Sequence, residues 1–497
     1  MQTDCASRRL FLQGLAGGVV VAASGAVAAA DAARAADESP APGTDAGPSI
    51  ADTIVQFAQS LRYEDLPEPV VQRVKRTILD TLGCAIAGYQ TGPSQIAVKL
   101  AAQVSSKPGA TVICAGFNSS PDRATFANGV MIRNLDFNDA YSTPVGGGHP
   151  SDSLAALLAA AEVAGRSGRD LILATAITYE VFCKLSDVLD IKSAGLDQST
   201  VLGIGSLVGA GSLLGHNREQ MLNAIGITVG GNTAINQGRV GTLSNWKDYA
   251  TAEASRKAIF SAQLALAGMT GPREIFEGPS GFFRVILRKS VQLPPLGEPY
   301  GILRASTKRF ALGQYSQSVA EAAAQIRSSF KSPDEIEEVN VHVSHNAMRV
   351  MAGSADKWHP TSHETADHSM PYATAVILMY GTIDDHYYDD PYLHDSKLLT
   401  LVNRVHCFAS AEADAREKDF NLCDLEVVLK SGDRKSVRVE YHRGHWRNPM
   451  NDAEMGDKFR SLARRQLSAE KTEALLQRLW DLDKLPKAAA LAQMTRV

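Results

Sequence analysis

The sequence predicts a mainly α-helical fold in which a large all-helical domain is combined with a smaller α+β domain. Apolar residues recur with helical spacing through most of residues 51–283. A Pro/Gly-rich stretch, Leu293–Gly301, ends this pattern, and strand-like segments follow it. The chain has 497 residues, of which 44% are hydrophobic, so it is long enough for two or more domains with a large buried core.

The first half of the chain is expected to be almost entirely helical. Spacings of i, i+3 and i+4 between apolar residues predict helices over Ala51–Leu61, Pro67–Gly88 and Ser153–Arg166. Glycines interrupt many of the segments that follow, which indicates close packing between helices at some cost in helix propensity. The broadly apolar segments that suit helices in the interior of this domain are Asp170–Leu189, Thr200–Leu214 and Arg218–Gly230.

The later part of the chain mixes the two kinds of element. A helix is expected over Ser316–Ser329, and Ile336–Val343 alternates apolar and polar residues as a half-buried strand does. Leu425–Leu429 and Ser436–Tyr441 are also strand-like, and Ser431-Gly432-Asp433 between them predicts a turn. These segments together predict an α+β domain.

The C-terminal part is predicted to be helical again, over Lys458–Asp483. We therefore expect a helical domain at residues 51–300, an α+β domain at 301–445 and a C-terminal return to the helical domain at 446–497. The sequence contains no internal repeat that would indicate a solenoid.

The N-terminus has the pattern of an export signal. Ser7-Arg8-Arg9-Leu10-Phe11-Leu12 is a twin-arginine motif, a mildly apolar run follows from Leu15 to Ala30, and Ala33-Arg34-Ala35 is a small-residue cleavage context. Residues 1–35 are therefore predicted to be a bacterial Tat signal peptide, with the mature protein in the periplasm. The alternative is a chance pair of arginines in a disordered tail. Residues 36–50, rich in Pro, Gly, Asp and Ala, are predicted to be a disordered linker.

Charge and cysteine content exclude several classes of function. With 50 basic and 54 acidic residues, the chain has no basic excess that would indicate nucleic-acid binding. No segment has the length and apolarity of a membrane span. The six cysteines contain no C-x-x-C pair, which argues against an iron–sulfur cluster or structural zinc. Single buried thiols are the expected role, and a disulfide stays open in an oxidising compartment.

The first candidate site lies around a glycine-rich loop. Arg133 and Asp136 precede the loop, and His149 leads into a helix start at Ser151 and Asp152. Histidine titrates near neutral pH and is suited to general acid–base catalysis, while free backbone N–H groups at a helix start can receive a carboxylate. The alternative is a structural loop in which Asp136 is a buried structural acid.

Two further candidates are lysines. Lys247, in Ser244-Asn245-Trp246-Lys247-Asp248, enters an Ala-rich helix, where partial desolvation would lower the pKa of its amine. The alternative is a lysine that extends its ammonium from a helix end into water. Lys308 lies in Thr307-Lys308-Arg309-Phe310.

The last candidate is a histidine-rich segment. His359, His363 and His368 are spaced four and five residues apart, and Pro360 argues against one continuous helix. The segment does not contain the H-E-x-x-H pattern of zinc enzymes. An acid–base or substrate-binding role is therefore favoured over a metal site, and no metal ligand is assigned.

These clusters, in this order and spacing, resemble the MmgE/PrpD family over nearly all of the chain after the linker. The family includes 2-methylcitrate dehydratase, cis-aconitate decarboxylase and an iminodisuccinate epimerase. The resemblance implies a homodimer, a helical domain with an α+β lid, an active site in the cleft between them, and no metal or organic cofactor. The motifs that carry it are Ile78–Gly83, Leu135–Asp139, His149–Asp152, Gly195–Gln198, Ser244–Lys247, Gly268–Pro272, Phe276–Gly278 and Thr365–Ser369.

By motif position, the resemblance implies a set of site residues. Arg133, Asp197 and His368 are assigned to substrate binding. Three positions depart from the family pattern and put the lid side of the pocket in question: Ala140 stands where relatives have Thr, Ala311 replaces a Pro, and Gly313 lies where a Glu/His-containing segment is common. The residues assigned to catalysis are Asp136, His149, Lys247, Lys308 and Tyr372.

The activity implied is cofactor-independent dehydration of a 2-hydroxy tricarboxylate, as in 2-methylcitrate dehydratase. We expect His149, held by Asp136, to be one acid–base group, and Tyr372 or Lys247 to be the other. Decarboxylation of cis-aconitate and epimerisation of iminodisuccinate stay open, because both use the same kinds of residue. A non-catalytic periplasmic carboxylate-binding protein is the second alternative. It would need the cations but not the whole acid–base set.

Overall fold

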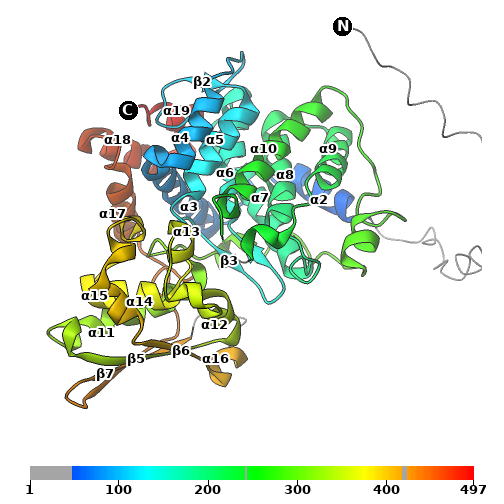
Figure 1. Cartoon of the computed structure of the whole chain (residues 1–497). Helices are drawn as coiled ribbons and strands as arrows, with labels where there is room; N and C mark the ends of the chain where they lie inside the picture. The colour runs from blue at the N-terminus through cyan, green and yellow to red at the C-terminus, as the bar shows by residue number, and fades with distance from the viewer. Residues whose placement is uncertain (1–47, 241–242, 417–421) are drawn as a thin grey trace, which may run out of the picture. The chain divides into compact units, whose positions relative to one another are not determined.

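The computed structural model describes residues 48–240, 243–416 and 422–497 of the chain (Figure 1). The predicted signal peptide and all but the end of the predicted linker lie outside these residues. The fold is mainly α, with a smaller α+β part, as the sequence predicts. No helix in these three ranges is long and apolar enough to cross a membrane.

Residues 48–240 and 243–266 are mainly helical, with two short two-stranded sheets, β1 (Ala110–Thr111) with β2 (Asn118–Ser119) and β3 (Tyr141–Ser142) with β4 (Gly147–Gly148) (Figure 1). Several of the helices are capped by the residues that the sequence places there: the Ser49 hydroxyl accepts from the Asp52 amide, and Ser167 with Asp170 forms a capping box. The helices are α2 (Ile50–Ser60), α3 (Glu68–Ala87), α4 (Gly92–Ala101), α5 (Pro121–Arg133), α6 (Leu154–Val163), α7 (Gly168–Val188), α8 (Ser199–Leu214), α9 (Arg218–Gly231) and α10 (Trp246–Leu266).

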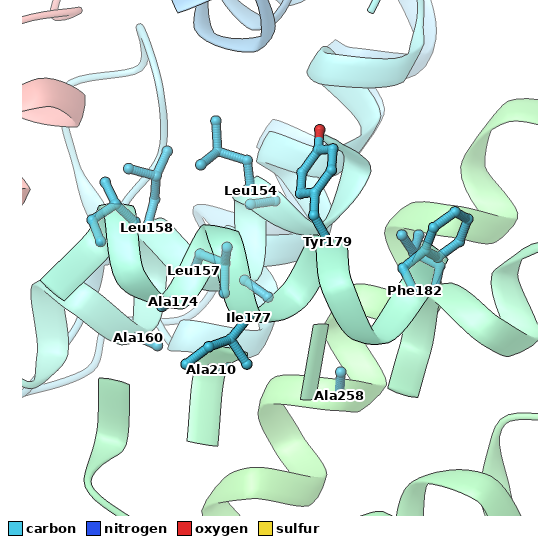
Figure 2. Packing of buried hydrophobic residues seen from close by; sticks show 14 of the residues in the cluster. Leu154, Leu157, Leu158, Ala160, Ala174, Ile177, Tyr179, Phe182, Ala210 and Ala258 are labelled. Carbon is cyan, nitrogen blue, oxygen red and sulfur yellow. The ribbon is translucent and has the colours of Figure 1, made fainter. Parts of the chain in front are cut away.

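Small residues allow the interior helices to approach closely. A Cβ on Gly209 of α8 would lie 2.0 Å from the Thr178 hydroxyl oxygen of α7, and one on Gly129 of α5 would lie 2.8 Å from the Ala252 Cβ of α10. Figure 2 shows the packing of apolar side chains from α6, α7, α8 and α10 in the same region. The glycines that interrupt the apolar segments therefore mark helix–helix contacts, as predicted.

The α+β part contains a four-stranded sheet in the order β6-β5-β7-β8, with helices α11, α12 and α14 on one side (Figure 1). The β5–β6 pair is parallel and the other pairs are antiparallel. The strands are β5 (Ile336–Val343), β6 (Val405–Ala409), β7 (Cys423–Leu429) and β8 (Arg434–Val439). The helices are α11 (Gln317–Ile326), α12 (His345–Ala352), α13 (His363–Ala366), α14 (Met370–Tyr380), α15 (Ser396–Val402) and α16 (Ala411–Ala415).

The C-terminal segment differs from its prediction. The single helix expected over Lys458–Asp483 is two helices, α17 (Asp452–Ala463) and α18 (Ala469–Trp480). The break occurs because Ser468 caps a new helix start, its hydroxyl accepting from the Lys471 amide. Both helices pack against α3, and α19 (Ala489–Gln493) packs against α6.

Two large hydrophobic clusters organise these elements. The helical core contains buried apolar residues from 50–305 and from 450–491. The sheet core contains buried apolar residues from 310–439. The boundaries predicted at residues 300 and 445 themselves stay predictions.

Candidate active site

A group of buried ionisable side chains lies where segments of the helical core meet a segment of the sheet core. Residues far apart in the sequence bring it together: the end of α5, the start of α10, the segment before η8 (Gln314–Ser316) and the segment before α14. Its members are Arg133, Asp136, Lys247, Asp248, Lys308, Asp367 and His368.

Asp136 is at the centre of this group. Its backbone is left-handed, with φ of 43°, an uncommon conformation for a residue other than glycine that is often found at functional sites. Lys308 Nζ lies 2.6 Å from Asp136 Oδ1 and 2.7 Å from its carbonyl oxygen, and Arg133 also donates to Oδ1. Although burial raises the pKa of Asp136, Arg133 and Lys308 outweigh it and hold that pKa well below its usual range.

Arg133 is surrounded by carboxylates. Its guanidinium is completely buried, with NH2 3.2 Å from Asp248 Oδ1 and Nε 3.7 Å from Asp152 Oδ2, besides the bond to Asp136. Burial raises the pKa of Asp152 to about 7, against the opposing effect of Arg133. The charge of Arg133 is therefore already engaged by protein groups in this structure, although the sequence assigns it to substrate binding.

The two lysines differ in a way the sequence does not predict. Lys247 Nζ lies 2.9 Å from His368 Nδ1, 3.2 Å from Asp367 Oδ2 and 3.4 Å from Asp248 Oδ1. Burial lowers the pKa of Lys247, but the carboxylates outweigh it and raise that pKa above its usual value. The expected lowering at Lys247 is therefore wrong. The pKa of Lys308 is lowered instead, because burial there exceeds the attraction of Asp136.

His149 follows a tight hairpin, β3 (Tyr141–Ser142) with β4 (Gly147–Gly148). Gly147 has φ of 116°, and a Cβ there would lie 2.3 Å from the Tyr141 carbonyl oxygen, so the turn requires glycine. His149 Nδ1 lies 2.6 Å from the Asp139 carbonyl oxygen. Because a carbonyl oxygen can only accept, Nδ1 carries the hydrogen, and Nε2 of the neutral ring is left with a free lone pair.

Electrostatics keep His149 in this neutral form. Burial, and then the charges of Arg133 and Lys308, hold the pKa of His149 well below its usual range. The ring is therefore unprotonated at neutral pH. The expectation that Asp136 holds His149 is wrong, since the Asp139 carbonyl holds the ring, while the Asp136 carboxylate contacts Arg133 and Lys308.

Asp139 was not assigned a role from the sequence, although it lies three residues after Asp136. Its carboxylate accepts from the Tyr179 hydroxyl at 2.6 Å and from the Ser151 amide at 3.2 Å. The sequence predicts that the backbone amides at this helix start bind a carboxylate of the substrate. The Ser151 amide instead already donates to the Asp139 carboxylate. Asp248 and Asp367 were missed in the same way. Asp248 directly follows Lys247, and Asp367 directly precedes His368, so each lies next to a residue assigned to the site. This adjacency in the sequence is the signal that could have identified them.

Two assigned residues are engaged elsewhere. The Tyr372 hydroxyl donates to the Tyr387 carbonyl oxygen at 2.6 Å, within the sheet core. Asp197 pairs with Arg239 and accepts from the Ser199 amide at 2.9 Å. Its neighbour Gln198 does approach the site, because its side-chain oxygen accepts from the His149 amide at 2.8 Å.

Asp136, Asp367 and His368 place three metal-type donor atoms within 4.8 Å of one another. Lysine ammonium groups already occupy these donors: Lys308 Nζ is 2.6 Å from Asp136 Oδ1, and Lys247 Nζ is 2.9 Å from His368 Nδ1. A divalent cation between them would be repelled by both lysines and by Arg133. The donor set therefore fits protonated amines better than a metal ion.

Two family models match most of the chain. Residues 52–293 match the MmgE/PrpD N-terminal domain, and residues 310–482 match the MmgE/PrpD C-terminal domain. The chain belongs to the MmgE/PrpD family.

Curated relatives in this family carry out different reactions. Human cis-aconitate decarboxylase is 26% identical over 465 residues, covering 90% of this chain and 95% of the relative. The 2-methylcitrate dehydratase of Escherichia coli K12 is 25% identical over 452 residues, covering 84% of this chain and 91% of the relative. That of Cupriavidus necator is 26% identical over 452 residues, with 84% and 90% covered. At 25–26% identity, these relatives do not distinguish the two activities for this chain.

Proposed function

We propose that this protein is a cofactor-independent lyase that dehydrates a 2-hydroxy tricarboxylate of the 2-methylcitrate type. The observation that carries the proposal is the state of His149. Its Nδ1 is committed to the Asp139 carbonyl oxygen, and its pKa lies well below the usual range, so Nε2 is available as a base at neutral pH. Two buried lysines of the charged group, Lys247 and Lys308, provide positive charge for a polycarboxylate, and Lys308 is close enough to His149 to lower its pKa.

In the proposed mechanism, His149 Nε2 removes the proton from the carbon next to a substrate carboxylate. The ammonium of Lys247, whose pKa is raised, stays charged and stabilises the enediolate that forms. Lys308, whose pKa is lowered, donates a proton to the departing hydroxyl group. The C–H and C–O bonds break, a C=C bond forms and water leaves. His149 and Lys308 then exchange protons with solvent.

Decarboxylation is the second candidate, because human cis-aconitate decarboxylase matches 90% of the chain. That reaction breaks a C–C bond and needs an acid to protonate the resulting carbanion, not a base to remove a proton. A neutral histidine therefore favours dehydration. Gly313, one of the departures from the family pattern, lies on the sheet-core side. A Cβ there would lie 2.7 Å from Met351 Cε and 3.4 Å from His368 Cδ2, so Met351 already occupies the place of a side chain.

The test is incubation of the purified protein with 2-methylcitrate, citrate, cis-aconitate or iminodisuccinate in D₂O, followed by proton NMR. Dehydration predicts vinylic or methyl signals of the unsaturated acid from 2-methylcitrate or citrate. Itaconate formed from cis-aconitate would instead assign a decarboxylase, and deuterium exchange without water loss would assign an epimerase. A thermal shift with these acids but no turnover would assign a carboxylate-binding protein.

The family resemblance supports a homodimer, and the N-terminal motif supports export. Light scattering on the mature protein is expected to give twice the chain mass, and a monomer mass would contradict the dimer. Fractionation of the bacterium is expected to place the protein in the periplasm. Replacing Arg8 and Arg9 with lysine is expected to retain it in the cytoplasm. Unchanged fractionation of that variant would contradict Tat export.

A further inference from the structure

Lys458, on α17 near the C-terminus, is buried and contacts three separate segments. Its Nζ lies 2.6 Å from Asp80 Oδ1 on α3, 2.9 Å from the Phe137 carbonyl oxygen and 2.7 Å from the Lys308 carbonyl oxygen. The same ammonium lies 3.8 Å from the centroid of the Phe137 ring. The ammonium thus donates two hydrogen bonds to backbone carbonyls and forms an ion pair with the Asp80 carboxylate.

Two of these acceptors belong to the backbone of the candidate site. Phe137 directly follows Asp136, and Lys308 is the residue whose Nζ lies 2.6 Å from Asp136 Oδ1. A single amine therefore bonds to the backbone on both sides of the Asp136–Lys308 ion pair. The two segments are also joined by the Ala140–Ser306 bridge, in which each amide donates to the other residue's carbonyl oxygen.

The left-handed backbone of Asp136 explains why the contacts of Lys458 matter for the site. A left-handed backbone at a residue other than glycine persists only where neighbouring contacts hold it. Lys458 bonds to the carbonyl of the next residue, Phe137, so it restrains the Phe137–Asn138 peptide, one residue beyond Asp136. Phe137 also packs against a small apolar cluster that includes Leu462 of α17, which restrains the same segment through apolar contact.

A second buried lysine in the same region serves as a comparison. Lys75 of α3 pairs with Asp483 of the C-terminal segment at 2.5 Å. Like Lys458 and Asp80, this pair joins α3 to the C-terminal part of the chain. None of the described contacts of the Lys75 ammonium involves a residue of the candidate site. The Lys75–Asp483 pair therefore stabilises the fold without a contact to the site.

We propose that Lys458 is a positioning residue for the lyase reaction, which sets the geometry of the Asp136–Lys308 pair from the C-terminal helix α17. The inference rests on the proposed function. It adds a residue that touches no substrate and acts through the backbone carbonyls of Phe137 and Lys308.

The test compares Lys458→Met with Lys75→Met and Asp80→Asn, using 2-methylcitrate as the substrate. Lys458→Met is expected to lower kcat about 10- to 100-fold, because displacement of catalytic groups by ~1 Å has effects of this size, with KM within about threefold. Lys75→Met is expected to keep kcat within about twofold while lowering Tm to a similar extent. Asp80→Asn is expected to lose less kcat than Lys458→Met, since the lysine keeps two N–H groups for the two carbonyls.

Equal kcat values in the two methionine variants would overturn the proposal, and so would an Asp80→Asn variant as impaired as Lys458→Met. If Lys458→Met yields no folded protein, Lys458→Gln replaces it, because its shorter amide cannot reach both carbonyls. A wild-type kcat in that variant would also overturn the proposal.

A structural readout separates this inference from the proposed function. In crystal structures, the Lys308 Nζ to Asp136 Oδ1 distance is expected to be close to 2.6 Å in the wild type and in Lys75→Met, and beyond hydrogen-bond range in Lys458→Met. An unchanged distance would overturn the positioning role. A wild type that transforms none of the four acids would overturn the proposed function, and the distance would still decide the role of Lys458.

Discussion

The two sides of the candidate site are held together in different ways. On the helical-core side, the reactive groups are tied to backbone carbonyls: His149 to Asp139, and Lys308 to Asp136. On the sheet-core side, Asp367 and His368 contact Lys247 of α10 through side-chain atoms. A hydrogen bond to a backbone carbonyl fixes a side chain in one position. A side-chain contact between the two cores can instead be replaced by a contact with a ligand. We therefore expect the reacting side chains on the helical-core side to keep their positions when a ligand binds.

Substitution of His149 by alanine is expected to have the largest effect. Loss of a positioned general base lowers rates by roughly 10²- to 10⁴-fold, so kcat should fall in this range while Tm changes little. Steady-state kinetics with 2-methylcitrate would measure it. His386→Ala, which changes an exposed histidine outside the site, is the matched control. A His149→Ala variant with kcat within threefold of wild type would remove His149 from the mechanism.

A stability comparison tests the two sides directly. Lys308→Met leaves the Asp136 carboxylate buried beside one fewer cation, which is expected to cost about 3–5 kcal/mol of unfolding free energy. Asp367→Asn should cost only about 1–3 kcal/mol, because Lys247 keeps its contact with Asp248. Urea unfolding of both variants would measure the difference. An equal or reversed order would show that the sheet-core side is held as firmly as the other.

The pH dependence of kcat/KM tests the assignment of His149 as the base. His149 must be neutral to act, so kcat/KM should rise with pH and reach a plateau once the pH exceeds its lowered pKa. The half-maximal point is expected below the ordinary histidine value of 6.5, with about a tenfold fall for each pH unit below it. A pH–rate profile would show this limb. A half-maximal point above 6.5 would contradict a base whose pKa is lowered by Arg133 and Lys308.

Tyr372 is expected to show the smallest effect. Its hydroxyl donates to the Tyr387 carbonyl oxygen inside the sheet core and has no described contact with the charged group. Tyr372→Phe should therefore lose about 1 kcal/mol of stability from one hydrogen bond and keep kcat within about threefold. A kcat decrease of tenfold or more would restore the catalytic role assigned from the sequence, and would require the hydroxyl to turn towards the site on substrate binding.

Local patterns predicted the elements well where one face of an element is buried. The strand at Ile336–Val343 was predicted to the residue, because its alternation matches a sheet with one face on the core. The edge strand β6 was missed, since only Val405 of Val405–Ala409 is fully buried and the segment has no regular alternation of buried and exposed residues. The helix over Lys458–Asp483 was predicted as one because both of its parts share the same periodicity, and the new start at Ser468 was not recognised.

The sequence by itself determined the family, the helical and strand periodicities, and most of the ionisable residues that meet at the site. The tertiary structure decided what each of these residues does. Lys308 and Asp136 are 172 residues apart in the chain, and only the folded chain brings them to a distance of 2.6 Å. Burial and neighbouring charge then set opposite pKa shifts on Lys247 and Lys308, because each shift depends on distances between atoms from separate segments. Periodicity is a property of neighbours in the chain, whereas electrostatics is a property of neighbours in space.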